Sequence, residues 1–172
     1  MSSRCVGYDP AMSLGGGPRI VAATRSDAPG VIDLIGRVFA EYDWIWEPAT
    51  EVLDLLGWTP HYEPPRGAFF VVREDDRIVG SVGVERAGEG TAELHRLYLD
   101  PPLRGRGLGE ALVHTILDWC RAQDIVRLVL WSDTRFTHAH RLYLRTGFRQ
   151  TGERALPEDV NQTREYQFER GV

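Results

Sequence analysis

The sequence contains no lysine, and all 20 of its basic residues are arginine. Enzymes that work through a lysine Schiff base, and phosphate-binding loops of the G-x-x-x-x-G-K-[ST] type, both need a lysine side chain. Both classes are therefore excluded. Cysteine is nearly as scarce, because Cys5 and Cys120 are the only two in 172 residues. That scarcity argues against a disulfide-stabilised secreted domain and favours a reducing, cytoplasmic location.

Long apolar runs and clusters of basic residues are also missing. No stretch approaches the roughly 18 consecutive apolar residues of a membrane span, and residues 1–19 hold no apolar segment such as a secretory signal needs. The net charge is −5, with 8 arginines against 15 acidic residues up to Glu93 and 12 against 10 from Leu94 onward. We therefore expect neither nucleic acid nor a membrane as a partner, although the more basic second half can accept a small anion.

The length and the 42% hydrophobic content suit a single packed domain. Residues 1–18 include Gly15, Gly16, Gly17 and Pro18 and show no hydrophobic periodicity, which predicts a flexible N-terminal tail. Met12 lies inside this tail and is an alternative start to Met1. The domain itself is expected to span residues 19–172.

Hydrophobic periodicity predicts strands and helices throughout this domain. Helices are expected from about Pro29 to Phe39 and over residues 51–56, 109–123 and 137–146, with a proline-rich connector up to residue 65 that ends the second of them. Strands are expected at residues 20–23, 68–73, 77–85, 92–99, 125–131, 148–152 and 165–169.

The strongest local motif is the loop Arg104-Gly105-Arg106-Gly107-Leu108-Gly109, which lies between a predicted strand and a predicted helix. Glycines let the backbone approach a ligand closely, and the free amides at a helix N-terminus attract anions. The loop thus predicts a phosphate site, or else a glycine-rich connection with surface arginines. It does not fit the dinucleotide fingerprint G-x-G-x-x-G, because Glu110 occupies the third glycine position.

This loop resembles the R/Q-x-x-G-x-G/A motif of the GNAT superfamily of acyl-CoA-dependent N-acyltransferases. A second match follows in the expected order, since residues 139–148 (AHRLYLRTGF) resemble the family's A-x-x-L-Y-x-x-x-G-F segment. The resemblance covers roughly residues 19–172. It implies an α/β (α+β) fold with a mixed, mostly antiparallel sheet of about six to seven strands flanked by helices.

The resemblance also implies acetyl-CoA as the acyl donor and an amine as the acceptor. The loop amides of Arg104, Gly105, Arg106, Gly107, Leu108 and Gly109 would bind the pyrophosphate of coenzyme A. The main chain of Leu97, Tyr98 and Leu99 would pair with the pantetheine arm, and the Leu97 amide would polarise the thioester carbonyl. Tyr143 corresponds to the family's general acid, which protonates the departing thiolate; the alternative is an aromatic side chain packed beside Leu142.

Glu93 is the first candidate for the base that deprotonates the acceptor, because part of the family carries a catalytic glutamate at this place on the strand. Strict alternation along the strand would put Glu93, His95 and Leu97 on one face and Leu94, Arg96 and Tyr98 on the other. On that expectation, Glu93 and His95 share the acceptor side. Other family members use a chain of water molecules instead, and a solvent-exposed Glu93 with a hydrogen-bonded His95 is equally compatible with the sequence.

The family usually builds its acceptor pocket from the first helices and their connection, which here holds Glu41, Trp44 and Trp46, with Glu51 just beyond. Acidic and aromatic side chains together suit a cationic amine. The same residues also suit aromatic packing beneath a helix junction with the acidic groups facing water.

Three further features bear on the cofactor contacts, on a metal site and on a covalent intermediate. Phe136 occupies the position, seven residues before the tyrosine, where family members commonly carry an asparagine that contacts the cofactor, so one polar contact is in doubt. His138 and His140 point to different sides of a helix and have no third ligand nearby, so no metal site is predicted. Cys120 falls on the apolar face of a helix, which favours a buried, inert thiol over an acyl-enzyme nucleophile.

The resulting prediction is an N-acetyltransferase that transfers acetyl directly from acetyl-CoA to an amine in a ternary complex. A non-catalytic acyl-CoA-binding or sensing module is the alternative. The sequence leaves open the acceptor, the length of the acyl group and the oligomeric state, although dimers are common in this family.

Overall fold

The structure is a computed structural model that describes residues 17–172, with two short 3-10 turns besides its regular elements. All but the last two residues of the predicted tail lie outside the described part. The strands are β1 (Arg19–Ala22), β2 (Gly67–Glu74), β3 (Arg77–Gly88), β4 (Thr91–Leu99), β5 (Arg127–Asp133), β6 (Arg149–Ala155) and β7 (Arg164–Gly171). The helices are α1 (Ala28–Ala40), α2 (Pro48–Glu51), α3 (Leu53–Leu56), α4 (Thr59–Tyr62), α5 (Leu108–Ala122) and α6 (Thr137–Arg145).

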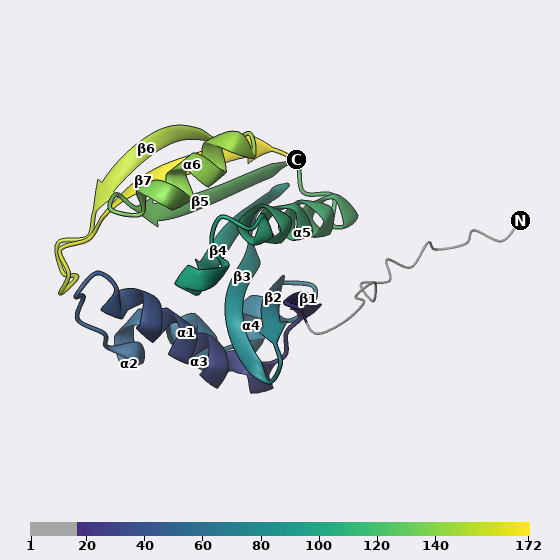
Figure 1. Cartoon of the computed structure of the whole chain (residues 1–172). Coiled ribbons are helices and arrows are strands. Elements are labelled where there is room, and N and C mark those ends of the chain that lie inside the picture. Colours follow the sequence, from purple (N-terminus) through teal and green to yellow (C-terminus); the bar gives the residue numbers. More distant parts are fainter. Residues whose placement is uncertain (1–16) are drawn as a thin grey trace, which may run out of the picture.

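The seven strands form one sheet in the order β1-β2-β3-β4-β5-β7-β6. Every neighbouring pair is antiparallel except β4 and β5, which are parallel and are joined through α5. A parallel pair needs such a crossover because the chain must return to the end of the sheet where the first strand began before the second strand can start. The predicted mixed, mostly antiparallel sheet flanked by helices is confirmed (Figure 1).

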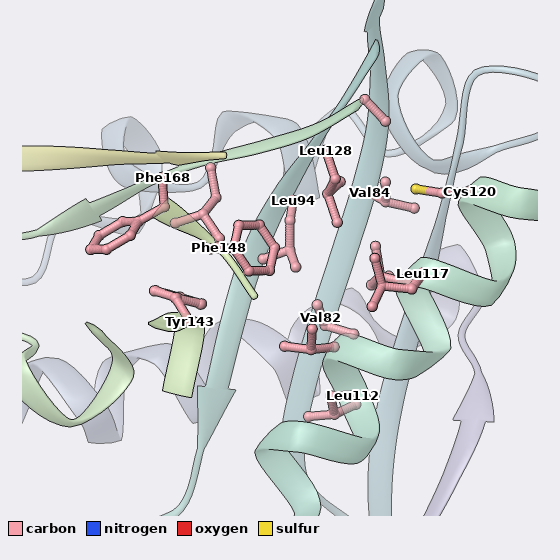
Figure 2. Packing of buried hydrophobic residues seen from close by; sticks show 14 of the residues in the cluster. Val82, Val84, Leu94, Leu112, Leu117, Cys120, Leu128, Tyr143, Phe148 and Phe168 are labelled. Atoms are coloured by element: carbon pink, nitrogen blue, oxygen red, sulfur yellow. The ribbon is translucent and has the colours of Figure 1, made fainter. Parts of the chain in front are cut away.

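Helices cover both faces of the sheet and divide the apolar side chains into two clusters. One, here called the α5 core, holds buried residues of α5 with Val82, Val84 and Leu94 of the central strands. Figure 2 shows these side chains together with Tyr143, Phe148 and Phe168. The other, the α1 core, holds the buried face of α1 and residues of α3 and α4 against β2. The apolar spacing of the two long helices therefore determines which side of each helix is buried against the sheet.

The proline-rich connector was predicted without a helix of its own, and that prediction is wrong. A short helix, α4, begins at Thr59, and Pro60 lies in its first turn. Proline is tolerated there because the first amides of a helix have no partner within the helix. Trp58 and Tyr62 then pack on Phe69, with ring centroids 5.1 Å and 4.7 Å away, so tertiary contacts hold this turn in place.

The expected alternation along β4 is also wrong beyond His95. Arg96 has a φ of 54°, and the pairing with β3 slips there, because Gly83 faces His95 while Ser81 faces Tyr98. This β-bulge adds a residue to one strand and shifts every later side chain to the opposite face. Leu97 consequently packs on the α5 core with Leu94, whereas Tyr98 packs on the α1 core.

The two parallel strands separate directly after their pairing ends. Cross-strand partners run from Thr91↔Arg127 to Leu94↔Leu130, and none is present beyond them in the described pairing of β4 with β5. The remaining residues of β4, His95 to Leu99, therefore have no hydrogen-bonding partner in β5, and the end of β5 has none in β4. This parting of the strands is where the site lies.

Candidate functional site

A cavity of about 990 Å³ opens between the separated ends of β4 and β5. It is lined by Leu97, Tyr98 and Leu99 on one side and by Trp131, Ser132 and Asp133 on the other. Residues of the glycine loop, of α6 and of the segment after α1 complete its wall. Predicted site residues that line it are Trp44, Leu97, Tyr98, Leu99, Arg104, Gly105, Gly107, Gly109 and Tyr143.

The glycine loop has the geometry of an anion site. Gly105 and Gly107 have φ values of 72° and 82°, a backbone region that residues with a side chain rarely adopt. No atom lies within 4 Å of a Cβ placed on either glycine. Gly107 is the N-cap of α5 and no side chain caps the helix, so its first amides face the open end. Gly109 permits a close approach of α6 to the start of α5, because a Cβ at this position would lie 3.0 Å from the Leu142 side chain.

Arg104 and Glu41 form a bidentate ion pair with both N···O distances at 2.7 Å. Arg104 also donates from Nε to the carbonyl oxygen of Leu99 at 3.0 Å. The structure thus places Glu41 against the glycine loop. It does not line the cavity, and its carboxylate is already engaged. Arg106 is exposed and Leu108 packs on the α5 core, so these two contribute to the loop through their backbone.

Tyr143 lies on α6 with only 4% of its surface exposed, and it is one of the cavity-lining residues. Its ring packs on Phe148 and Phe168, with centroids 5.8 Å and 5.3 Å away (Figure 2). Burial raises the pKa of Tyr143 well above its usual value, the nearby Tyr98 adds to that rise, and a hydrogen bond with the Ser132 side chain opposes it. The phenol is therefore protonated at neutral pH and can act as a proton donor.

Glu93 lies in the part of β4 that pairs with β5, His95 directly follows the last paired residue, Leu94, and neither Glu93 nor His95 lines the cavity. The His95 Nδ1 lies 3.8 Å from a Glu93 carboxylate oxygen. Burial lowers the pKa of His95, while Glu93 raises it in part, so the ring is mainly neutral near pH 7. Both side chains share one face, as predicted, and it is the face of Glu85, which pairs with Glu93 in the sheet and contacts His61 of α4.

Arg96 holds the bulge against the short helices. Its guanidinium donates to both carboxylate oxygens of Asp54, at 3.1 Å and 2.5 Å, and to the carbonyl oxygen of Glu51 at 2.8 Å. The Tyr62 hydroxyl also donates to Asp54. Burial alone would raise the pKa of Asp54, but the hydrogen bonds from Arg96 and Tyr62 keep it below its usual value.

Comparison with known proteins decides what this arrangement belongs to. The model of the family described as Acetyltransferase (GNAT) family matches residues 37–148, which include the bulge, the glycine loop and Tyr143. The chain belongs to the GNAT family. The family and fold expected from the two motifs are thereby confirmed.

Several GNAT relatives show how far the likeness extends. N-acetyltransferase 8F1 of Rattus norvegicus is 33% identical over 72% of this chain, and the aligned part is 58% of that longer protein. N-alpha-acetyltransferase RimI of Mycobacterium tuberculosis is 33% identical over 78% of this chain and 80% of its own length. A GNAT acetyltransferase structure from Staphylococcus aureus superposes with a TM-score of 0.78 at 22% identity, over 90% of this chain and 99% of that one, which shows a common fold.

An aromatic group stands where many GNAT proteins carry a polar contact. Phe136 packs on Tyr42 and Trp44, with ring centroids 5.1 Å and 5.2 Å away, and the Arg135 guanidinium lies 4.0 Å from the Trp44 ring. Phe136 therefore ties the segment after α1 to the loop before α6. Trp46, predicted to bind substrate, instead packs on Phe39 with centroids 4.8 Å apart, and it does not line the cavity.

Charge is distributed unevenly around this GNAT cavity. Beside the glycine loop the wall carries Arg104 and three basic residues of α6: His138, Arg141 and Arg145. Glu51 of α2 and Asp159 of the β6–β7 loop line it elsewhere, and both also border a smaller hollow with Glu47 and Glu158. Asn161 clamps these two segments together, since its side chain bonds the main chain of Ile45 at 2.9 Å and 3.0 Å. The cavity thus offers one region to an anion and another to a cation.

Sequence reasoning missed Arg96 and Asp54, and it treated Glu51 only as a neighbour of the aromatic segment. No local pattern marks these residues, because the bulge and the packing of α2 and α3 bring them to the site. Among the described residues, no group of three His, Cys, Asp or Glu side chains is placed to hold a metal ion. No helix in residues 17–172 is both long and apolar enough to cross a bilayer.

Proposed function

We propose that this chain transfers the acetyl group of acetyl-CoA to a primary amine by direct attack within a ternary complex, with residues 19–172 as the catalytic domain. The observation that carries the proposal is the single cavity in which the glycine loop, the unpaired end of β4 and Tyr143 meet. Its basic region suits the phosphates of coenzyme A, and its acidic region suits an amine.

The residues present fit the donor. The uncapped amides at the start of α5 and the positive φ of Gly105 and Gly107 leave room for a pyrophosphate against the backbone. Leu97 to Leu99 can pair with an extended pantetheine arm as a further strand would. Leu97 follows the bulge and lines the cavity, where its amide would stabilise negative charge on a thioester oxygen.

Tyr143 then acts as the general acid. From reference pKa values near 10 for a phenol and 8.5 for a thiol, proton transfer to the thiolate is uphill by about 2 kcal/mol. Burial raises the pKa of Tyr143 further, but it raises the pKa of a thiol in the same cavity as well. The free-energy cost of the proton transfer therefore stays small enough for a well-positioned phenol to act as the general acid.

No cavity-lining residue offers a thiol nucleophile in the described part of the chain. Cys120 is fully buried in the α5 core, and burial raises its pKa to about 12. A neutral buried thiol is a poor nucleophile, which supports direct transfer over an acyl-enzyme.

The proposal is tested by measuring thiol release from acetyl-CoA across a panel of amines, amino acids, aminoglycosides and short peptides. The panel includes free peptide N-termini because one relative is named an N-alpha-acetyltransferase. We expect acceptor-dependent release that falls about 100-fold or more in Tyr143→Phe, since that variant keeps the ring packing and loses the proton.

Tight binding of coenzyme A without release for any acceptor would instead support the non-catalytic acyl-CoA-binding module. Full activity of Tyr143→Phe would contradict the role given to the phenol.

A further inference from the structure

We infer that Glu51, and not Glu93, is the general base that takes a proton from the acceptor ammonium. The inference rests on the proposed function. In the step proposed, the ammonium gives one proton to the Glu51 carboxylate, and the neutral amine forms the C–N bond with the thioester carbon. The C–S bond breaks as Tyr143 protonates the leaving sulfur, and the second proton of the nitrogen restores the phenol.

The backbone of Glu51 is fixed at the wall of the cavity. Its carbonyl oxygen accepts a hydrogen bond of 2.8 Å from Arg96, the residue at the bulge that precedes Leu97. Glu51 lines the same cavity as Leu97 and Tyr143. Arg96 therefore holds the end of α2 against the bulge of β4.

Glu51 interacts electrostatically with Tyr98, which in turn interacts with Tyr143. The charge of Glu51 contributes to the raised pKa of Tyr98, although burial is the main cause and Arg96 opposes it. Tyr98 in turn contributes to the raised pKa of Tyr143. Tyr98 thus lies close enough to both Glu51 and Tyr143 to interact electrostatically with each.

Of the four other cavity-lining carboxylates, three are already engaged in hydrogen bonds. Asp133 is held by Arg135, and Glu165 is held by Arg154. Asp159 accepts hydrogen bonds from the amides of Asn161 and Thr163. Glu110 lies in the first turn of α5, beside the glycine loop. In the described part of the chain, no hydrogen bond or ion pair engages the Glu51 carboxylate.

The surroundings of Glu51 suit a base. Burial raises its pKa, and the carboxylates of Asp159 across the cavity and Glu47 at the start of α2 raise it further, while Arg96 of β4 lowers it. A carboxylate whose pKa is closer to neutral accepts a proton more readily than an ordinary glutamate. Glu93 lies outside the cavity beside His95, so it would need an intervening relay.

The test is the pH dependence of kcat/KM for Glu51→Gln, Glu93→Gln and Glu51→Asp with the best acceptor of the panel. Below the pKa of the acceptor amine, we expect Glu51→Gln to lose about 100-fold. The loss should shrink as the pH rises through that pKa, because the amine then arrives neutral. Glu51→Asp should retain part of the activity that Glu51→Gln loses. The affinity for coenzyme A should be unchanged in both Glu51 variants.

Glu158→Gln is the matched control. It removes the same charge from the neighbouring hollow without touching the cavity wall, and we expect its activity within about twofold of the unmodified protein.

A loss in Glu51→Gln that lies in KM alone, with kcat unchanged, would mean attraction of the cation alone and would overturn the inference. So would a pH-dependent loss confined to Glu93→Gln. Both results leave the acetyltransferase proposal intact, whereas unmodified protein that releases no thiol with any acceptor contradicts that proposal and this inference together.

Discussion

At Gly107 the backbone takes a φ of 82°, and no atom lies near the position of an added Cβ. Gly107→Ala should therefore cost about 1–2 kcal/mol of stability from backbone strain alone. If the substituted loop relaxes out of this conformation, the α5 amides turn away from the ligand. We expect the Kd for coenzyme A to rise at least 10-fold, as measured by isothermal titration, with the fold retained.

Gly88→Ala provides the comparison, because its added Cβ also meets no atom within 4 Å and Gly88 is not among the glycines of positive φ. That variant should bind coenzyme A normally. An unchanged Kd in Gly107→Ala would show that the loop geometry is not what holds the phosphates.

Single residues differ in how visible their roles are from sequence. The glycine loop and Tyr143 stand in short motifs whose chemistry depends on neighbours along the chain, so they could be predicted. Glu51 has no such motif, because its surroundings come from Arg96 and Asp159, which are far away in the sequence. Glu41 was predicted to face the acceptor, and its pairing with Arg104 could not be foreseen without the relative position of α1 and the loop.

At the scale of elements, the ion pair of Arg96 with Asp54 joins β4 to the short helices. Asp54 holds Arg96, whose side chain is only 21% exposed. Breaking one partner of such a pair leaves the other charge uncompensated, so Asp54→Asn should lower the free energy of unfolding by about 3 kcal/mol in urea denaturation. Asp118→Asn, which breaks an exposed pair with Arg121, should change it by less than about 0.5 kcal/mol.

The same pair predicts how this difference depends on pH. The fold lowers the pKa of Asp54, so its contribution is complete above the unfolded value of about 3.9 and is lost as the pH falls through the lower folded value. The stability gap between the unmodified protein and Asp54→Asn should be constant from pH 8 to 5 and narrow below about pH 4. A gap that widens toward acid would contradict the account.

The long elements could be predicted because each carries its own period. The apolar spacing of α1 and α5 gave their bounds to within a residue or two. The bulge at Arg96 could not be predicted, because the period-2 rule assumes an unbroken strand and nothing in the residue types marks the slip. The turn of α4 was hidden for a related reason, since its stability comes from Trp58 and Tyr62 packing on β2.

For the whole molecule, the order of the strands creates the site. The parallel strands β4 and β5 stop pairing after Leu94↔Leu130, and residues of α5, α6, the segment after α1 and the β6–β7 loop line the cavity at their separated ends. Arg104, Arg141 and Arg145 line the cavity wall at the glycine loop and α6, and Glu51 and Asp159 line it at α2 and the β6–β7 loop. An anionic donor and a cationic acceptor can thus occupy one cavity at the same time.

Initial-rate kinetics with acetyl-CoA and an acceptor amine varied together test this central claim most directly. Simultaneous occupation of the cavity and direct transfer predict double-reciprocal lines that intersect, with no acetylated protein detectable by mass spectrometry after incubation with acetyl-CoA alone. Parallel lines together with a stable acetyl-protein that passes its acetyl group to the amine would contradict the claim.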